Sequence, residues 1–249
     1  MTFGNTARRR SPNIEQDFDG LFGIMRSRRF RNGEDTGGEP ANYIYAYPPQ
    51  KEPEVERRIS ALANRLQGMT PVDADDSAPA ILVINLYELA VSIMKANDVF
   101  DTAIEQEPDM HGDASEADTD TSGDPGDHPW PTLQEDDFYQ ALAGMLGPDN
   151  DDLRDALRSR YLEAKADREA DLVFLTGVGQ VYPYIRAHAL LNCVQEVVDE
   201  HTPVIVFFPG TYEKTASTVS VMRLFDRLES DNYYRAFSLN TALEEEASE

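Results

Sequence analysis

The sequence predicts an α/β fold: three layers, with helices on both faces of a mostly parallel sheet of about five strands, plus a disordered acidic insertion. Three short runs, AILVI (80–84), DLVFLT (171–176) and PVIVFF (203–208), are continuously apolar, as strands buried on both faces are. A helical pattern separates the last two, and such a β-α-β unit makes parallel strands with a right-handed crossover. The insertion, at about 105–131, has too little apolar surface to offset its ordering entropy.

The other elements of the N-terminal half follow from the spacing of apolar residues. Ser11 and Pro12 are typical of a helix start, and the apolar residues after them recur at helical spacing. Asn85 with Glu88 predicts the cap of a further helix. The predicted elements are a helix ending near residue 30, a strand at 42–47, a helix over 55–69, the strand at 80–84 and a helix carrying Leu89 and Ile93.

The C-terminal half continues the alternation of helices and strands. Thr132 with Glu135 predicts another helix cap. The elements predicted here are helices over 132–145 and 153–161, a strand at 171–176, the loop GVGQVY (177–182), a helix from Pro183 to about Asp199, a strand at 203–208, a helix near 217–229 and an edge strand in NYYRAFSL. We therefore expect a basic arm and helix at 1–31, followed by a single α/β domain at 32–249 that the insertion interrupts.

The charge of the chain is strongly negative and unevenly distributed. The formal charge is −24, and only 4 lysines occur against 18 arginines, which suits a protein from a halophilic source. Residues 1–31 hold seven arginines and three acids, about +4, so by subtraction from −24 the rest carries about −28. This arm could contact nucleic acid or pair with acids of this chain or a partner. The arginines are Arg8, Arg9, Arg10, Arg26, Arg28, Arg29 and Arg31.

The start of the chain lacks the apolar core of a signal peptide, and no apolar run reaches about 18 residues, so we expect a cytoplasmic protein. Cys193, the single cysteine, lies in an apolar helical stretch, which indicates a core residue rather than a nucleophile. The four histidines form no triad or zinc spacing. We therefore expect no metal, no cofactor and no complete catalytic site.

Any ligand of such a sheet should lie beyond the carboxyl ends of its strands, at the loops GVGQVYP, PGTY and PPQ. Gly177 and Gly179 are followed by Tyr182 where a dinucleotide motif needs a third glycine, and the chain has no Walker motif. The glycines therefore indicate a tight strand-to-helix turn rather than a phosphate cradle. Arg186 lies in the first predicted turn of the next helix and could bind an anion, a partner carboxylate or an acid of this chain.

Two further groups of polar and aromatic residues are candidates for a contact surface. His188, Asn192 and Gln195 form a polar stripe that indicates a solvated helix face. The cluster at 232–237 is rich in residue types that anchor protein interfaces. The complete candidate surface is Gly177, Gly179, Tyr182, Arg186, His188, Asn192, Tyr212, Asn232, Tyr233 and Arg235.

The segments TGVGQVYPYIRAHALLNCVQ, PVIVFFPGTY, RLFDRL and DNYYRAF resemble, in order and spacing, the C-terminal signature of the BrxB family of BREX phage-exclusion systems. YIYAYPP and VINLYEL resemble its N-terminal half. The resemblance implies a role beside a phosphatase-like PglZ protein, a large ATPase and an adenine-specific DNA methyltransferase, with no known enzymatic activity. The acidic insertion and the basic arm depart from the family pattern.

We therefore expect a non-catalytic interaction subunit of a BREX complex that binds a PglZ-type protein, supports host DNA methylation and phage exclusion, and contacts DNA only within the complex. Two alternatives remain. One is a degenerate nucleotide-binding protein or nuclease that uses Arg186 with Glu213 or Asp231. The other is a DNA-binding subunit that acts through the arginine-rich arm.

Overall fold

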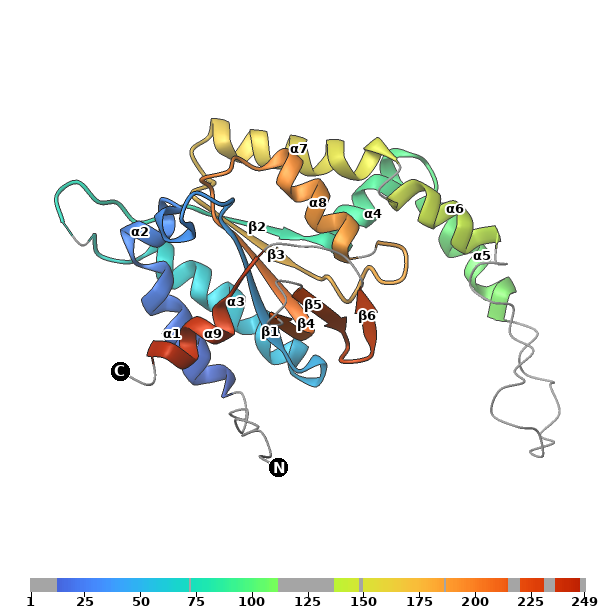
Figure 1. The fold of residues 1–249 in the computed structure, drawn as a ribbon. Helices are drawn as coiled ribbons and strands as arrows, with labels where there is room; N and C mark the ends of the chain where they lie inside the picture. Colours follow the sequence, from blue (N-terminus) through green and yellow to red (C-terminus); the bar gives the residue numbers. More distant parts are fainter. Residues whose placement is uncertain are drawn as a thin grey trace, which may run out of the picture.

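The computed structural model describes residues 13–71, 73–111, 137–147, 150–185, 187–214, 220–230 and 236–246. Its centre is a parallel sheet of five strands in the order β2-β3-β4-β1-β7. Helices cover both faces of this sheet, which confirms the predicted three-layer α/β class (Figure 1). The strands are β1 (Asn42–Tyr47), β2 (Ile81–Asn85), β3 (Leu172–Thr176), β4 (Val204–Lys214) and β7 (Phe237–Ser238).

One face of the sheet is covered by α1 (Ile14–Met25), α3 (Glu52–Gln67) and α9 (Leu239–Glu246). Their apolar stripes enclose a core with the side chains of alternate strand residues, including Tyr45, which is fully buried. Its hydroxyl donates to the Asp17 carboxylate at 3.0 Å, so the polar end of this tyrosine is satisfied inside the core. Two short elements, α2 (Arg28–Arg31) and the 3-10 turn η1 (Glu34–Thr36), lead into β1.

The opposite face is covered by α4 (Leu86–Ala96), α7 (Asp151–Ala166) and α8 (Ala187–Val197). The predicted β-α-β unit is confirmed, because β3 and β4 pair in parallel with α8 between them. The predicted start of α8 at Pro183 is too early, since residues 181–185 form turns and the helix begins at Ala187. Further out lie α5 (Phe100–His111) and α6 (Asp137–Leu146) (Figure 1).

The predicted insertion begins too early at residue 105, because α5 continues to His111. The rest of the insertion, and the Thr132–Glu135 cap, lie outside the described residues. In the described part of the predicted edge strand, only Phe237 and Ser238 form a strand, β7, and Leu239 already begins α9. Residues 232–235 lie outside the described residues.

The helix predicted near 217–229 is wrong. The described part of this segment is a hairpin of β5 (Ser220–Leu224) and β6 (Leu228–Ser230), and β5 pairs antiparallel with the far half of β4. Met222 and Leu224 are buried while Arg223 between them is exposed, which is the alternation of a strand. Phe225 and Asp226 have φ of 55° and 61°, a left-handed turn that an α-helix does not contain.

Candidate functional site

The carboxyl edge of the sheet is where a ligand is expected. The connection that leaves β1 (α3) lies on one face of the sheet, and the connection that leaves β3 (α8) lies on the other, so the direction of the connections reverses at β4, which lies between these strands. The loops after β1 and β3 and the far half of β4 meet at this edge. We call these loops and their contacts the mouth: residues 47–56, 177–185 and 209–213.

Gly177 packs against the start of the neighbouring helix. Its φ is +75°, and a Cβ there would lie 3.1 Å from Asn85 Oδ1. That oxygen accepts hydrogen bonds from the backbone N–H groups of Tyr87 (2.9 Å) and Glu88 (3.1 Å), which confirms the predicted cap. The Asn85 side chain therefore occupies these two N–H groups at the start of α4.

Gly179 is covered by an aromatic ring from the hairpin. A Cβ there would lie 2.8 Å from Phe225 Cε1 and 3.0 Å from Pro209 Cγ. Tyr182 meets Phe225 edge-on, with ring centroids 6.2 Å apart, and its bond to Pro183 is cis. The backbone N–H of Gln180 donates to Gly177 O at 3.0 Å, which closes the tight turn that the sequence predicts. Because Gly177 and Gly179 have no side chains, Asn85, Phe225 and Pro209 can pack closely against this loop.

Two carboxylates of the mouth, Glu52 and Glu56, were missed by sequence reasoning. Gln180 Nε2 donates to Glu56 Oε1 at 2.6 Å, which joins the glycine loop to α3. Burial, and then the charge of Glu56, raises the pKa of Glu52. Burial raises the pKa of Tyr47, and both glutamates raise it further. Glu52 lies in the first turn of α3, where the helix dipole favours carboxylates, and this was the available signal for it. No local signal placed Glu56 beside the glycine loop.

The structure brings only part of the predicted surface to the mouth. Gly177, Gly179 and Tyr182 lie there. Tyr212, however, is buried, and its hydroxyl donates to Ala236 O at 2.8 Å, which ties the far half of β4 to the residue before β7. Asn192 is exposed on α8. Arg186, Asn232, Tyr233 and Arg235 lie outside the described residues, as do Asp231 and the side chain of His188, while Glu213 lies in β4.

Cys193 is 8% exposed in the core between α8 and the sheet. Burial raises the pKa of its thiol, which disfavours the thiolate form. Among the residues that the structure describes, no group of three His, Cys, Asp or Glu side chains could hold a metal ion. None of the described helices is long and apolar enough to span a bilayer.

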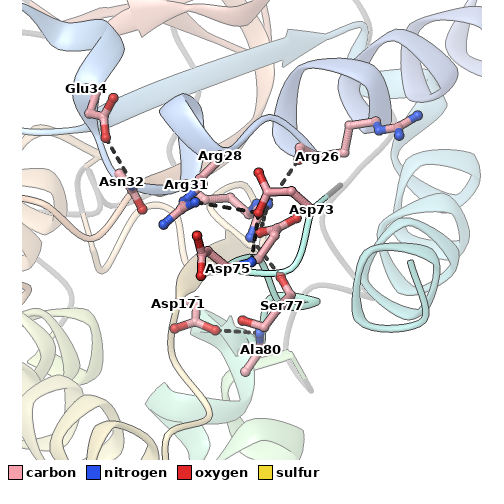
Figure 2. Close-up of polar contacts among 11 residues, drawn as sticks. Arg26, Arg28, Arg31, Asn32, Glu34, Asp73, Asp75, Ser77, Ala80 and Asp171 are labelled. Carbon is pink, nitrogen blue, oxygen red and sulfur yellow. Dashed lines mark hydrogen bonds and ion pairs between the residues drawn. The ribbon is translucent and has the colours of Figure 1, made fainter. Parts of the chain in front are cut away.

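The opposite, amino edge of the sheet holds part of the basic arm (Figure 2). Arg31 Nη2 pairs with Asp76 at 2.7 Å, with side chains 9% and 2% exposed, and Arg31 Nη1 donates to Ser77 O at 2.9 Å. Arg28 pairs with Asp73 at 3.8 Å and Arg29 with Asp35 at 3.2 Å, both exposed. These three arginines therefore bind acids of their own chain, whereas Arg8, Arg9 and Arg10 lie outside the described residues.

Comparison with known proteins finds the same family that the segments of the sequence resemble. A family model described as "BREX protein BrxB" matches residues 82–239. A BREX protein BrxB of Bacillus cereus (strain H3081.97) is 30% identical over 226 residues, which cover 91% of this chain and 97% of that protein. A BREX protein BrxB of Escherichia coli O9:H4 (strain HS) is 27% identical over 229 residues, 92% of each chain. No solved structure matches significantly.

Proposed function

Because the chain belongs to the BrxB family of BREX proteins, we propose that it is a non-catalytic interaction subunit of the anti-phage BREX system and binds a PglZ-type protein. In this proposal it supports host DNA methylation and phage exclusion, and it contacts DNA only within the complex. The methyltransferase and the ATPase of the system are possible further partners. A cytoplasmic location is part of the same proposal.

The close packing of the mouth is the observation that supports a role in binding rather than in catalysis. A nucleotide at this edge would need backbone N–H groups open to its phosphates. Here Phe225 and Pro209 cover Gly179, and Asn85 occupies the start of α4. The carboxylates of Glu52 and Glu56 beside them repel phosphate.

We further propose that the partner contacts the candidate surface around the mouth. Arg186, Tyr233 and Arg235 are of the residue types that dominate binding energy at protein interfaces. Tyr182 is half-buried against Phe225, and Gln180 is exposed beside it, so a partner would meet a preorganised loop.

The test is co-purification of the tagged protein, in high-salt buffer, from cells that carry its neighbouring genes. We expect capture of a PglZ-type protein by the wild type, and loss of that capture in a variant with Arg186→Ala, Tyr233→Ala and Arg235→Ala. A matched control with Arg158→Ala, Arg160→Ala and Tyr87→Ala changes the same residue types at exposed positions of α7 and α4. No capture by the wild type would refute the proposed partner, and equal loss in both variants would refute the proposed surface.

A further inference from the structure

The two edges of the parallel sheet differ. At one edge, β7 has only two residues, and Asn240 continues its pairing along β1. At the other edge, β2 pairs with β3 along its whole length, and no other described strand pairs with β2. Native sheets protect an edge with a very short strand, a charge, a proline or a bulge. β2 has five residues, ILVIN, without charge or proline, and its register with β3 is continuous. This edge therefore lacks the usual protection against pairing.

The backbone of Val83, in the middle of β2, faces the free edge. Leu172 of β3 donates its N–H to Ala80 O at 3.2 Å. Backbone groups alternate in direction along a strand, so those of Leu82 also face β3 and those of Val83 face away. The same alternation directs the N–H of Asn85 toward the free edge. None of the described residues hydrogen-bonds to the N–H or C=O of Val83 or to the N–H of Asn85.

The free edge is open at Val83. This residue is 38% exposed, whereas Phe174, which lies opposite it in β3, is fully buried. The edge thus offers two N–H donors and one C=O acceptor at the spacing of a strand. The backbone of an extended segment is complementary to such a row and binds by adding a strand to the sheet.

A second copy of this chain fits this edge poorly. Each copy carries a formal charge of −24, so two copies repel each other. A stable dimer buries at least about 1,200 Å² around an apolar core, and Val83 is the one large apolar side chain of β2 that is exposed. A single extended segment needs no such core, because main-chain hydrogen bonds supply its affinity.

An exposed acid lies at each end of this edge. At the amino end Asp171 accepts the N–H of Ala80 at 2.8 Å, and at the carboxyl end Glu88 lies in the first turn of α4. We propose that the free edge of β2 binds an extended segment of a partner protein as an added strand. The segment has a β-branched residue beside Val83 and basic residues at its ends, opposite the two acids. This inference rests on the proposed role as an interaction subunit and assigns a chemistry to one partner segment.

The direct test measures binding of a fluorescent octapeptide, Lys-Thr-Val-Thr-Val-Thr-Val-Lys, to the full-length protein by anisotropy. The same peptide N-methylated at its six central residues is the control probe, because it keeps the side chains and the charge but has no central N–H groups. We expect the first probe to bind and the control probe not to bind. No binding of the first probe, or equal binding of both, would overturn the inference.

Two substitutions at Val83 separate its N–H from its side chain. Val83→Pro removes the outward N–H but leaves the β2–β3 ladder intact, because that N–H takes no part in the ladder. Val83→Thr keeps the N–H and the β-branched shape. We expect binding about tenfold weaker for Val83→Pro and a change of less than about twofold for Val83→Thr. A folded Val83→Pro variant that binds the probe like the wild type would refute the strand pairing.

Hydrogen exchange of the wild type is a second measurement, which does not depend on the folding of a variant. In the isolated protein the Val83 amide should exchange faster than the Leu82 amide, which pairs with β3. Saturating probe should slow the Val83 amide by at least about tenfold. Protection in the free monomer would mean that another part of this chain covers the edge, and protection that accompanies a dimer in sedimentation would mean a second copy. Either result would overturn the assignment to a partner.

The basic ends of the segment are tested separately. Glu88→Gln removes one of the two acids and should weaken binding of the first probe about twofold. Asp155→Asn, at an exposed position of α7, is the charge-matched control and should leave binding unchanged. Equal effects of the two substitutions would refute the basic ends.

Co-purification separates this inference from the proposed function. Capture of a PglZ-type protein, without any binding of the probe, would refute the strand site and leave the proposed function standing. Binding of the probe without capture of a PglZ-type protein would refute the proposed partner and leave the edge of β2 as a binding site.

Discussion

Asn240 pairs with both backbone polar groups of Ala46. The N–H of Ala46 donates to Asn240 Oδ1 at 2.8 Å, and Asn240 Nδ2 donates to Ala46 O at 2.9 Å. Since β7 pairs with β1 only at Tyr43 and Ile44, this side chain continues the ladder after the backbone has turned into α9. The side-chain amide thus acts as a strand partner that the two-residue β7 is too short to provide.

Replacing this amide should destabilise the protein. Asn240→Ala leaves a part-buried donor and acceptor of β1 unpaired, so we expect the free energy of unfolding to fall by about 1–3 kcal/mol. Urea denaturation measures this change, and hydrogen exchange should show faster exchange of the Ala46 amide. Thr241→Ala, at the exposed next position of α9, is the control and should change stability by less than about 0.5 kcal/mol. Equal effects would show that the Asn240 amide contributes little.

The Arg31–Asp76 pair should contribute more to stability than the neighbouring surface pair. Both of its side chains are buried, so Asp76→Ala leaves an uncompensated charge, and we expect a loss of about 3–5 kcal/mol. Asp35→Ala breaks the exposed pair with Arg29 and should cost less than about 1 kcal/mol. Chemical denaturation of both variants at low and high salt tests this. A loss below about 1 kcal/mol for Asp76→Ala would contradict the expected contribution of the Arg31–Asp76 pair to the free energy of unfolding.

The contact between Gly179 and Phe225 predicts a coupled pair of substitutions. Gly179→Ala places a Cβ against the Phe225 ring and should destabilise by about 1–3 kcal/mol. In a Phe225→Ala background the same change should cost less, because the ring is gone. A double-mutant cycle by urea denaturation measures this coupling. Gly23→Ala, where a Cβ meets nothing within 4 Å, is the control. Additive effects would mean that the ring does not enforce glycine at this position.

Alkaline pH should destabilise the fold through its buried tyrosines. The pKa of Tyr43 is raised to about 12 by burial and by Asp35, against an ordinary value of 10.0. Between these values the unfolded chain loses the proton and the folded chain keeps it, so stability is complete below pH 10 and falls as pH rises toward 12. Tyr45 and Tyr47, whose pKa values burial also raises, act in the same direction.

The Tyr43→Phe variant isolates one of these contributions, because it removes the ionisable group without breaking a hydrogen bond to any residue that the structure describes. We expect its stability relative to the wild type to increase from pH 9 to pH 11.5, measured as the midpoint of urea unfolding. A constant difference between the wild type and Tyr43→Phe would mean that this hydroxyl ionises normally in the folded state.

The sequence by itself determined the elements whose signal is local. β3 is a continuous apolar run because a parallel sheet buries both of its faces, and the Asn85 cap needs only residues within one helical turn. β2 was predicted to be buried on both faces, but it lies at the edge of the sheet and Val83 is 38% exposed. The tight turn at Gly177 and Gly179 was also predictable, since a dinucleotide motif would need a third glycine.

The tertiary structure alone decided the hairpin and the contacts along the outer side of β1. The apolar spacing of Val221, Leu224 and Leu228 fits a helix, but pairing with the far half of β4 makes this segment a strand, and neighbouring strands override a local pattern. These contacts join residues that are distant in sequence: Tyr43 meets Phe237, and Asn240 binds Ala46. They form only when the strand order brings these segments together, because no local pattern encodes contacts made across the sheet.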